Sequence, residues 1–140
     1  MSQAVEAREH GRQQAQAHLD TIVELMAAIR SARSGRTIRF DDAWLSLEEL
    51  EERACELPLS LLVRSGWAAP GCGLTVGEYE ILLCTGGPAV RIRSDLSEHA
   101  DPATARMEAQ DWFVPWKPLT TSTDEDEDLA ELAALFWFGS

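Results

Sequence analysis

The chain has 140 residues, of which 45% are hydrophobic, and a formal net charge of −12 at neutral pH. This size and hydrophobic content are typical of one domain with its own core, so we expect residues 1–140 to fold together. The acidic balance argues against a protein that binds nucleic-acid backbones directly, because its field repels polyanions. It suits a partner that is itself basic.

The cysteines and the N-terminus predict a cytoplasmic protein. Cys55, Cys72 and Cys84 are odd in number, widely spaced and without a C-x-x-C pair, which is typical of free thiols in a reducing compartment. The first twenty residues lack the apolar core of a signal peptide. No apolar run approaches the ~20 residues of a membrane-spanning helix, so we expect no membrane segment.

Two helices are predicted in the N-terminal part. Residues 1–34 contain no proline, and apolar residues recur there at helical spacing: Ala15, Leu19, Ile22, Met26 and Ile29. Gly35 follows as a left-handed cap. Residues 35–45 form a connection, and we expect four of its apolar side chains to dock on the core: Ile38, Phe40, Trp44 and Leu45. Ser46 and Glu49 then predict a capping box at the start of a second helix, which ends before Pro58.

A small antiparallel sheet is predicted over residues 59–116. Its centre is a hairpin in which two apolar runs, 78–84 and 88–93, flank a Gly-Gly turn. Alternating residues predict two more strands over 59–67 and 104–112, which makes about four strands in all. Pro115 interrupts the apolar cluster of residues 112–116, so we expect this cluster to pack at an edge or corner of the sheet. Thr123 is expected to cap a last helix over 124–138, so the fold class is α+β.

The acidic run Asp124, Glu125, Asp126, Glu127 and Asp128 is the first candidate for a partner-binding surface. One or two carboxylates at a helix N-terminus are explained by the helix dipole, but five exceed that need. The run could therefore imitate a polyanion and compete for a basic, nucleic-acid-binding protein. The alternative is that it serves only as an N-terminal cap.

Two tryptophans and a neighbouring carboxylate complete the candidate contact surface. Trp112 and Trp116 lie on an irregular segment beside Asp111, and tryptophan concentrates binding energy at protein interfaces. The alternative is that both rings belong to the core.

No catalytic, metal or cofactor site is predicted. His10, His18 and His99 match neither H-E-x-x-H nor a thiol-pair spacing. Cys84 precedes the Gly-Gly turn, but no general base accompanies it in the sequence, so a buried thiol is the simpler interpretation.

Two motifs carry a resemblance to a known family. The run 78–92, E-Y-E-I-L-L-x-T-G-G-P-A-V-R-I, and the run 110–116, Q-D-W-x-x-P-W, resemble a family of small acidic proteins from phages, plasmids and integrated elements of proteobacteria. The resemblance covers roughly residues 2–34 and 56–138. Most members of the family have no assigned activity, and the resemblance implies no catalytic residue in this chain. Genes of this size and charge in such elements frequently encode inhibitors of host defence, including anti-CRISPR and antirestriction proteins.

Three hypotheses follow. The first is a non-enzymatic protein that inhibits a nucleic-acid-handling defence complex of the bacterial host, such as a CRISPR effector subunit, by protein–protein contact. The second is a cryptic metal-dependent enzyme on nucleotides or nucleic acid, with Asp111 among the metal ligands. The third is a homo-oligomeric adaptor, for example a homodimer, built on the apolar stripe from Ala15 to Ile29.

Overall fold

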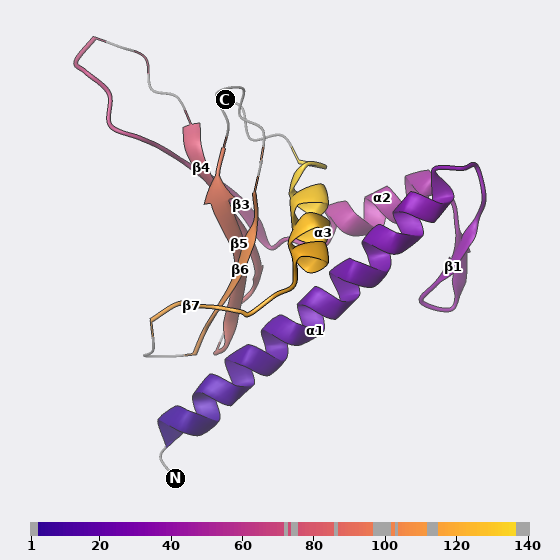
Figure 1. The fold of residues 1–140 in the computed structure, drawn as a ribbon, viewed down its shortest axis with the longest axis horizontal. Coiled ribbons are helices and arrows are strands. Elements are labelled where there is room, and N and C mark those ends of the chain that lie inside the picture. The colour runs from indigo at the N-terminus through magenta and orange to yellow at the C-terminus, as the bar shows by residue number, and fades with distance from the viewer. Residues whose placement is uncertain are drawn as a thin grey trace.

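A computed structural model describes residues 3–71, 73, 76–85, 87–96, 102, 104–111 and 115–136, with residues 3–9 and 76 described by their backbone alone. Within these ranges the chain forms three helices and seven strands in two sheets (Figure 1). The α+β class predicted from the sequence is confirmed.

Helix α1 (Gln3–Ala32) is the longest element, and it runs diagonally beside the main sheet (Figure 1). Its predicted apolar stripe is buried, with every member at 2% exposure or less: Ala15, Leu19, Ile22, Met26 and Ile29. Gly35 follows the helix in the left-handed region at φ 93°, and its amide donates to Ala32. The stripe therefore packs inside its own chain and is not exposed to a second copy.

The segment after α1 is a hairpin rather than a simple connection. Strands β1 (Ile38–Phe40) and β2 (Ala43–Leu45) pair through a two-residue turn, Asp41-Asp42, in which both residues have positive φ. This is the turn geometry that matches strand twist, and aspartate tolerates it better than most residues. Leu45 is buried as predicted, but Trp44 is 66% exposed, so its expected docking on the core is wrong.

The two shorter helices both begin with a capping box. Ser46 and Glu49 exchange hydrogen bonds at the start of α2 (Leu47–Cys55), as the sequence predicted. For α3 (Thr123–Ala133) the cap is Ser122 paired with Glu125, not Thr123. Both serine and threonine can cap, and the glutamate three residues after Ser122 decides between them.

The main sheet has five antiparallel strands, one more than predicted: β3 (Ser60–Ser65), β4 (Val76–Cys84), β5 (Ala89–Asp95), β6 (Arg106–Gln110) and β7 (Lys117–Pro118), in that order. The central hairpin, β4 with β5, is confirmed. The additional strand β7 is two residues long and contains Pro118, which is tolerated because β7 lies at the edge. The strand β3 forms the opposite edge.

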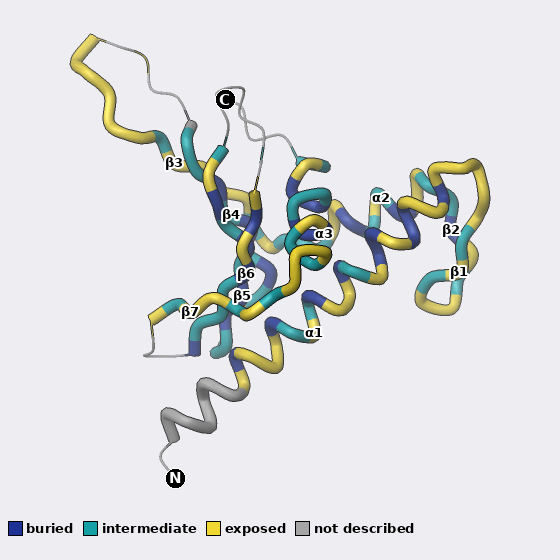
Figure 2. Tube along the Cα trace, in the orientation of Figure 1, coloured by how far each residue is buried: buried dark blue, intermediate teal, exposed yellow. Residues whose placement is uncertain are grey.

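The helices cover one face of the sheet and leave the other open (Figures 1 and 2). Alternate residues of the central strands point to the helices and are buried, among them Tyr79, Ile81, Val90, Ile92 and Met107. Helix α1 packs over β5 and β6, and α3 packs on α1. The intervening residues of the same strands therefore face solvent, and they include most of the charged side chains of the sheet.

Candidate functional site

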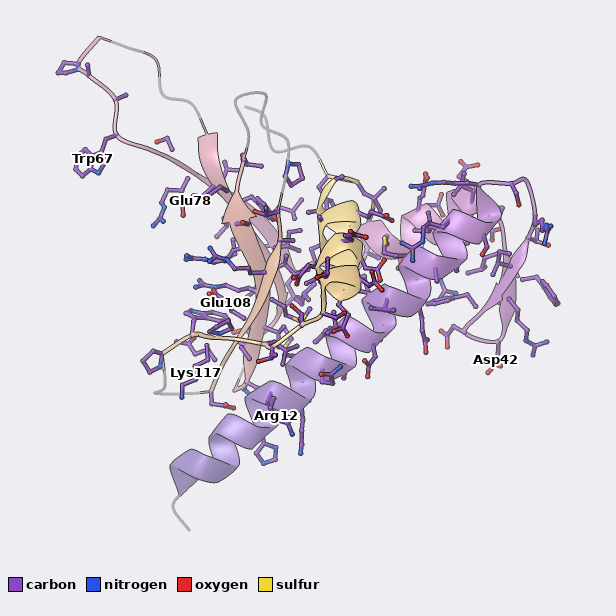
Figure 3. The ribbon with its side chains drawn as sticks, viewed as in Figure 1. Arg12, Asp42, Trp67, Glu78, Glu108 and Lys117 are labelled. Carbon is purple, nitrogen blue, oxygen red and sulfur yellow. The ribbon has the colours of Figure 1, made fainter. Side chains whose placement is uncertain are left out.

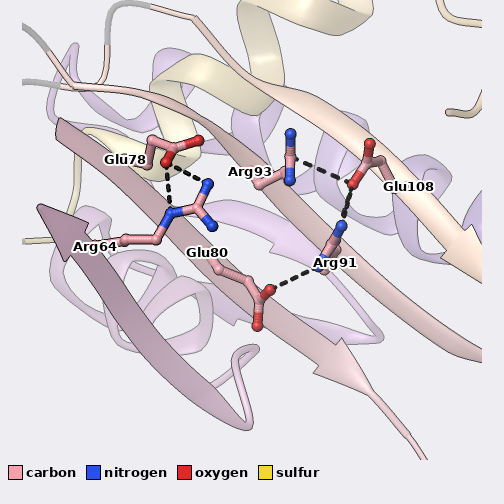
Figure 4. Close-up of polar contacts among 6 residues, drawn as sticks. All are labelled: Arg64, Glu78, Glu80, Arg91, Arg93 and Glu108. Carbon is pink, nitrogen blue, oxygen red and sulfur yellow. Dashed lines mark hydrogen bonds and ion pairs between the residues drawn. The ribbon is translucent and has the colours of Figure 1, made fainter. Parts of the chain in front are cut away.

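The open face of the sheet carries an ordered network of charges centred on Arg91 (Figure 4). Nε of Arg91 donates to Glu108 on β6 at 2.8 Å, and Nη1 donates to Glu80 on β4 at 2.9 Å. The ring of Trp116 stacks on the guanidinium, whose carbon lies 4.0 Å from the ring centroid. The Arg91 side chain is only 14% exposed, so the pairs are held in place.

The network continues toward the β3 edge. Arg93 lies 3.5 Å from Glu108, and Arg64 on β3 donates to Glu78 at 2.6 Å. A shallow hollow of about 340 Å³ lies beside these pairs and is lined by the apolar Leu62 and by the charged residues Arg64, Glu78, Glu80, Arg91 and Arg93. The labelled Glu78 and Glu108 point away from the helices (Figure 3). The hollow has both signs of charge in pairs, so it offers a partner hydrogen-bonding groups but little net field.

Three of the five residues in the acidic run have structural contacts within the chain. Asp128 is buried and accepts a 2.6 Å hydrogen bond from Arg30 of α1, and this bond raises the pKa of Arg30. Glu125 completes the capping box, and Asp126 accepts from the hydroxyl of Thr121. Asp124 and Glu127 remain exposed on the surface of α3.

The fold does not place Asp111 and Trp116 on the surface of α3 beside the acidic run. Trp112 lies outside the described residues. Trp116 is half-buried on the open face of the sheet against Arg91, not on the side of α3. Asp111 is 4% exposed and packs against Gly11 of α1, with its Oδ1 accepting no hydrogen bond from a described residue. Asp111 therefore does not belong to the exposed surface.

Charge is divided between the helical side and the sheet. Residues 10–56 and 119–136, which form α1 from residue 10 onward, α2, α3 and the β1–β2 hairpin, carry fifteen acidic and six basic side chains. The described residues from 59 to 118, which form the sheet, carry five of each. The excess negative charge of the described chain thus lies on the helical side.

An exposed tryptophan stands on this acidic side. Trp44 lies on the β1–β2 hairpin, across the strand pair from Arg39, and the turn between the strands consists of Asp41 and Asp42. The hairpin projects at the end of α1, and the labelled Asp42 lies at its outer side (Figure 3). The exposure of Trp44 could not be predicted from the sequence, because a tryptophan in a short apolar run is more often buried.

The described residues bring together no group of three or more His, Cys, Asp and Glu side chains arranged to hold a metal ion. Burial raises the pKa of the Cys84 thiol, which disfavours the thiolate that a nucleophile would need. Within the described ranges, none of the helices combines the length and hydropathy needed to cross a bilayer.

Comparison of the chain with protein-family models, with curated proteins and with solved structures finds no match.

Proposed function

We propose that this protein is a non-enzymatic binding protein that inhibits a nucleic-acid-handling defence complex of its host by protein–protein contact, in the manner of anti-CRISPR or antirestriction proteins. The observation that carries the proposal is the division of charge, with fifteen acidic against six basic side chains on the helical side. Proteins that bind nucleic acid present basic grooves, and an acidic, rigid surface is complementary to such a groove.

The contact surface in this proposal consists of three parts of the helical side. Helix α2 contributes the exposed Glu48 and Glu52, and α3 contributes Asp124 and Glu127. The hairpin contributes the exposed ring of Trp44, which suits the role of an aromatic anchor. Acidic residues that make structural contacts within the chain, such as Asp128, stabilise the fold and are not part of the proposed contact surface.

We infer the class of target from the net charge and from the family that residues 78–92 and 110–116 resemble. A basic surface that normally holds DNA or RNA would be attracted over a distance of about 10 Å at ordinary ionic strength. The attraction speeds association and falls with added salt. A complex formed in this way needs no chemistry from the inhibitor.

The test is a pull-down from the lysate of the host, with identification of the captured proteins. The contact variant carries Glu48→Gln, Glu52→Gln, Asp124→Asn and Glu127→Gln, all at exposed positions. We expect wild type to retain a nucleic-acid-handling complex and this variant to lose it. The control variant, Glu78→Gln with Glu80→Gln, removes acids from the open sheet face and should retain the complex. Equal capture by wild type and by the contact variant would contradict the proposal.

A further inference from the structure

The edge strand β3 and the residues beside it form an apolar exposed segment. Six large hydrophobic side chains of the described chain are exposed, and five of them lie in this segment: Leu59, Leu61, Leu62, Val63 and Trp67. Among the described strands, β3 pairs with β4 alone, so its other edge presents unpaired backbone amides and carbonyls.

This edge lacks the features that usually prevent strand pairing. Natural edge strands are protected by central charges, by proline or by a bulge. In β3 the charged residue is Arg64, near one end, and the irregularity in pairing falls between Arg64 and Ser65. Pro58 precedes the strand. The centre, Leu61-Leu62-Val63, is therefore open to another strand.

We propose that β3 pairs with β3 of a second copy of this chain, antiparallel, about a twofold axis that is perpendicular to the sheet and passes midway between the two copies of Leu62. The local charge favours a second copy. The chain has a net charge of −12, yet residues 57–77 contain no acidic side chain. Two copies can therefore approach here without opposed carboxylates, whereas a basic partner would find nothing to pair with.

Symmetry restricts the register of this pairing. A twofold axis perpendicular to the sheet keeps the helices of both copies on the same side, so directly opposed residues must share a face. Residues of equal parity meet that condition, and pairing Leu62 with Leu62 uses residues 60–64, which is all of the strand except Ser65 beyond the irregularity. Leu61 then opposes Val63 of the second copy on the helical side, which matches aliphatic to aliphatic. Arg64 opposes Ser60 of the second copy, so like charges do not meet.

The pairing also accounts for the exposure of Leu61 and Val63. Both lie opposite residues of β4 that face the helices, namely Ile81 and Tyr79, which are buried. The helices pack over β5 and β6 and leave the β3 end of this face uncovered. Four aliphatic side chains, two from each copy, would cover one another there.

The first test is the molar mass of the full chain in solution, measured by light scattering after size exclusion at high micromolar concentration. We expect the mass of two chains for wild type. Leu62→Lys places two ammonium groups at the twofold axis and should give the mass of one chain. Trp44→Lys is the matched control, since Trp44 is also an exposed hydrophobic residue but lies on the separate hairpin, and it should stay dimeric.

The second test is cross-linking in a Cys55→Ser, Cys72→Ser background. Opposed residues at the axis bring their Cβ atoms to about 5 Å, so Leu62→Cys should form a disulfide between copies on mild oxidation. Arg64→Cys should not, because the two copies of residue 64 are four residues apart along the paired strands, about 13 Å.

A wild-type chain that stays monomeric would overturn the proposal, and so would a Leu62→Lys variant that stays dimeric. If wild type were monomeric and Leu62→Lys lost the captured host complex, the edge would bind a segment of the target, and the second copy would be excluded. These results are independent of the contact variant on α2 and α3, so the two proposals can fail separately.

Discussion

The carboxylate of Asp111 packs directly against the backbone of Gly11, at the point where the end of β6 meets α1. A Cβ atom added at Gly11 would lie 2.5 Å from Oδ2 of Asp111 and 3.0 Å from Oδ1. Glycine inside a helix costs about 1 kcal/mol relative to alanine, so its use here is explained by this close approach. The helix continues through Gly11 without a break.

Gly11→Ala should therefore destabilise the protein in spite of the gain in helix propensity. We expect a loss of about 1 to 3 kcal/mol in the free energy of unfolding, measured with urea, because the side chain overpacks a buried contact. In an Asp111→Ala background the same change should cost less, since the clashing oxygens are gone. A stabilising effect of Gly11→Ala in the wild-type background would contradict this packing.

Removal of Arg91 should weaken the open face of the sheet. Arg91→Ala removes the cation that Glu80 and Glu108 share, leaves Glu108 with Arg93, and removes the guanidinium on which the ring of Trp116 stacks. We expect a loss of about 2 kcal/mol in urea unfolding, the scale of a hydrogen-bonded charged group. Arg64→Ala is the control: that side chain is largely exposed, and its loss should change stability by about 0.5 kcal/mol or less.

Residues of the acidic run should differ in how much they contribute to the stability of the fold. Asp128→Ala removes the 2.6 Å contact with Arg30 that joins α3 to α1, and we expect a cost of about 1 kcal/mol, reduced because Arg30 is partly exposed and keeps Glu131. Asp124→Ala, at an exposed position of the same helix, should be neutral within about 0.5 kcal/mol. Thermal unfolding of the two variants side by side checks this. Equal losses would mean that the contact with Arg30 adds nothing.

His18 should make the fold sensitive to mild acid. Burial lowers the pKa of His18, so between the lowered value and about 6.5 the unfolded chain binds a proton that the folded chain does not. The contribution of neutral His18 to the free energy of unfolding is therefore fully present above about pH 6.5 and is lost as the pH falls below that value. His18→Gln should reduce this fall between about pH 7 and pH 5.5, measured by the urea midpoint. An unchanged slope would show that other groups cause it.

Local patterns in the sequence predicted the elements that are set by local chemistry. The stripe from Ala15 to Ile29, the capping box of Ser46 with Glu49 and the central hairpin were all found, because periodicity, caps and glycine turns act over a few residues. Strands β1 and β2 were missed because each has three residues and their turn is Asp-Asp without glycine or asparagine. A run of three residues is too short to show the alternation of hydrophobic and polar residues that predicts a strand.

The candidate site was harder to predict, because it depends on contacts between distant segments. Nothing local marks Asp128 as the partner of Arg30, which lies almost a hundred positions earlier in the chain. The same holds for Asp111, whose burial depends on a glycine in another element. Leu61 and Val63 alternate correctly for a strand, yet alternation does not show that the helices leave their end of the sheet uncovered.

The proposed function is tested most directly by competition for the captured host complex. Purified protein is titrated against that complex bound to a labelled nucleic acid, and release of the label is measured. We predict release at a ratio of about one chain, or one dimer, to each basic site, weakened by added salt, and lost in the Glu48, Glu52, Asp124 and Glu127 variant. Release at far lower ratios, with the nucleic acid or the complex chemically altered, would instead show an enzyme and contradict the account.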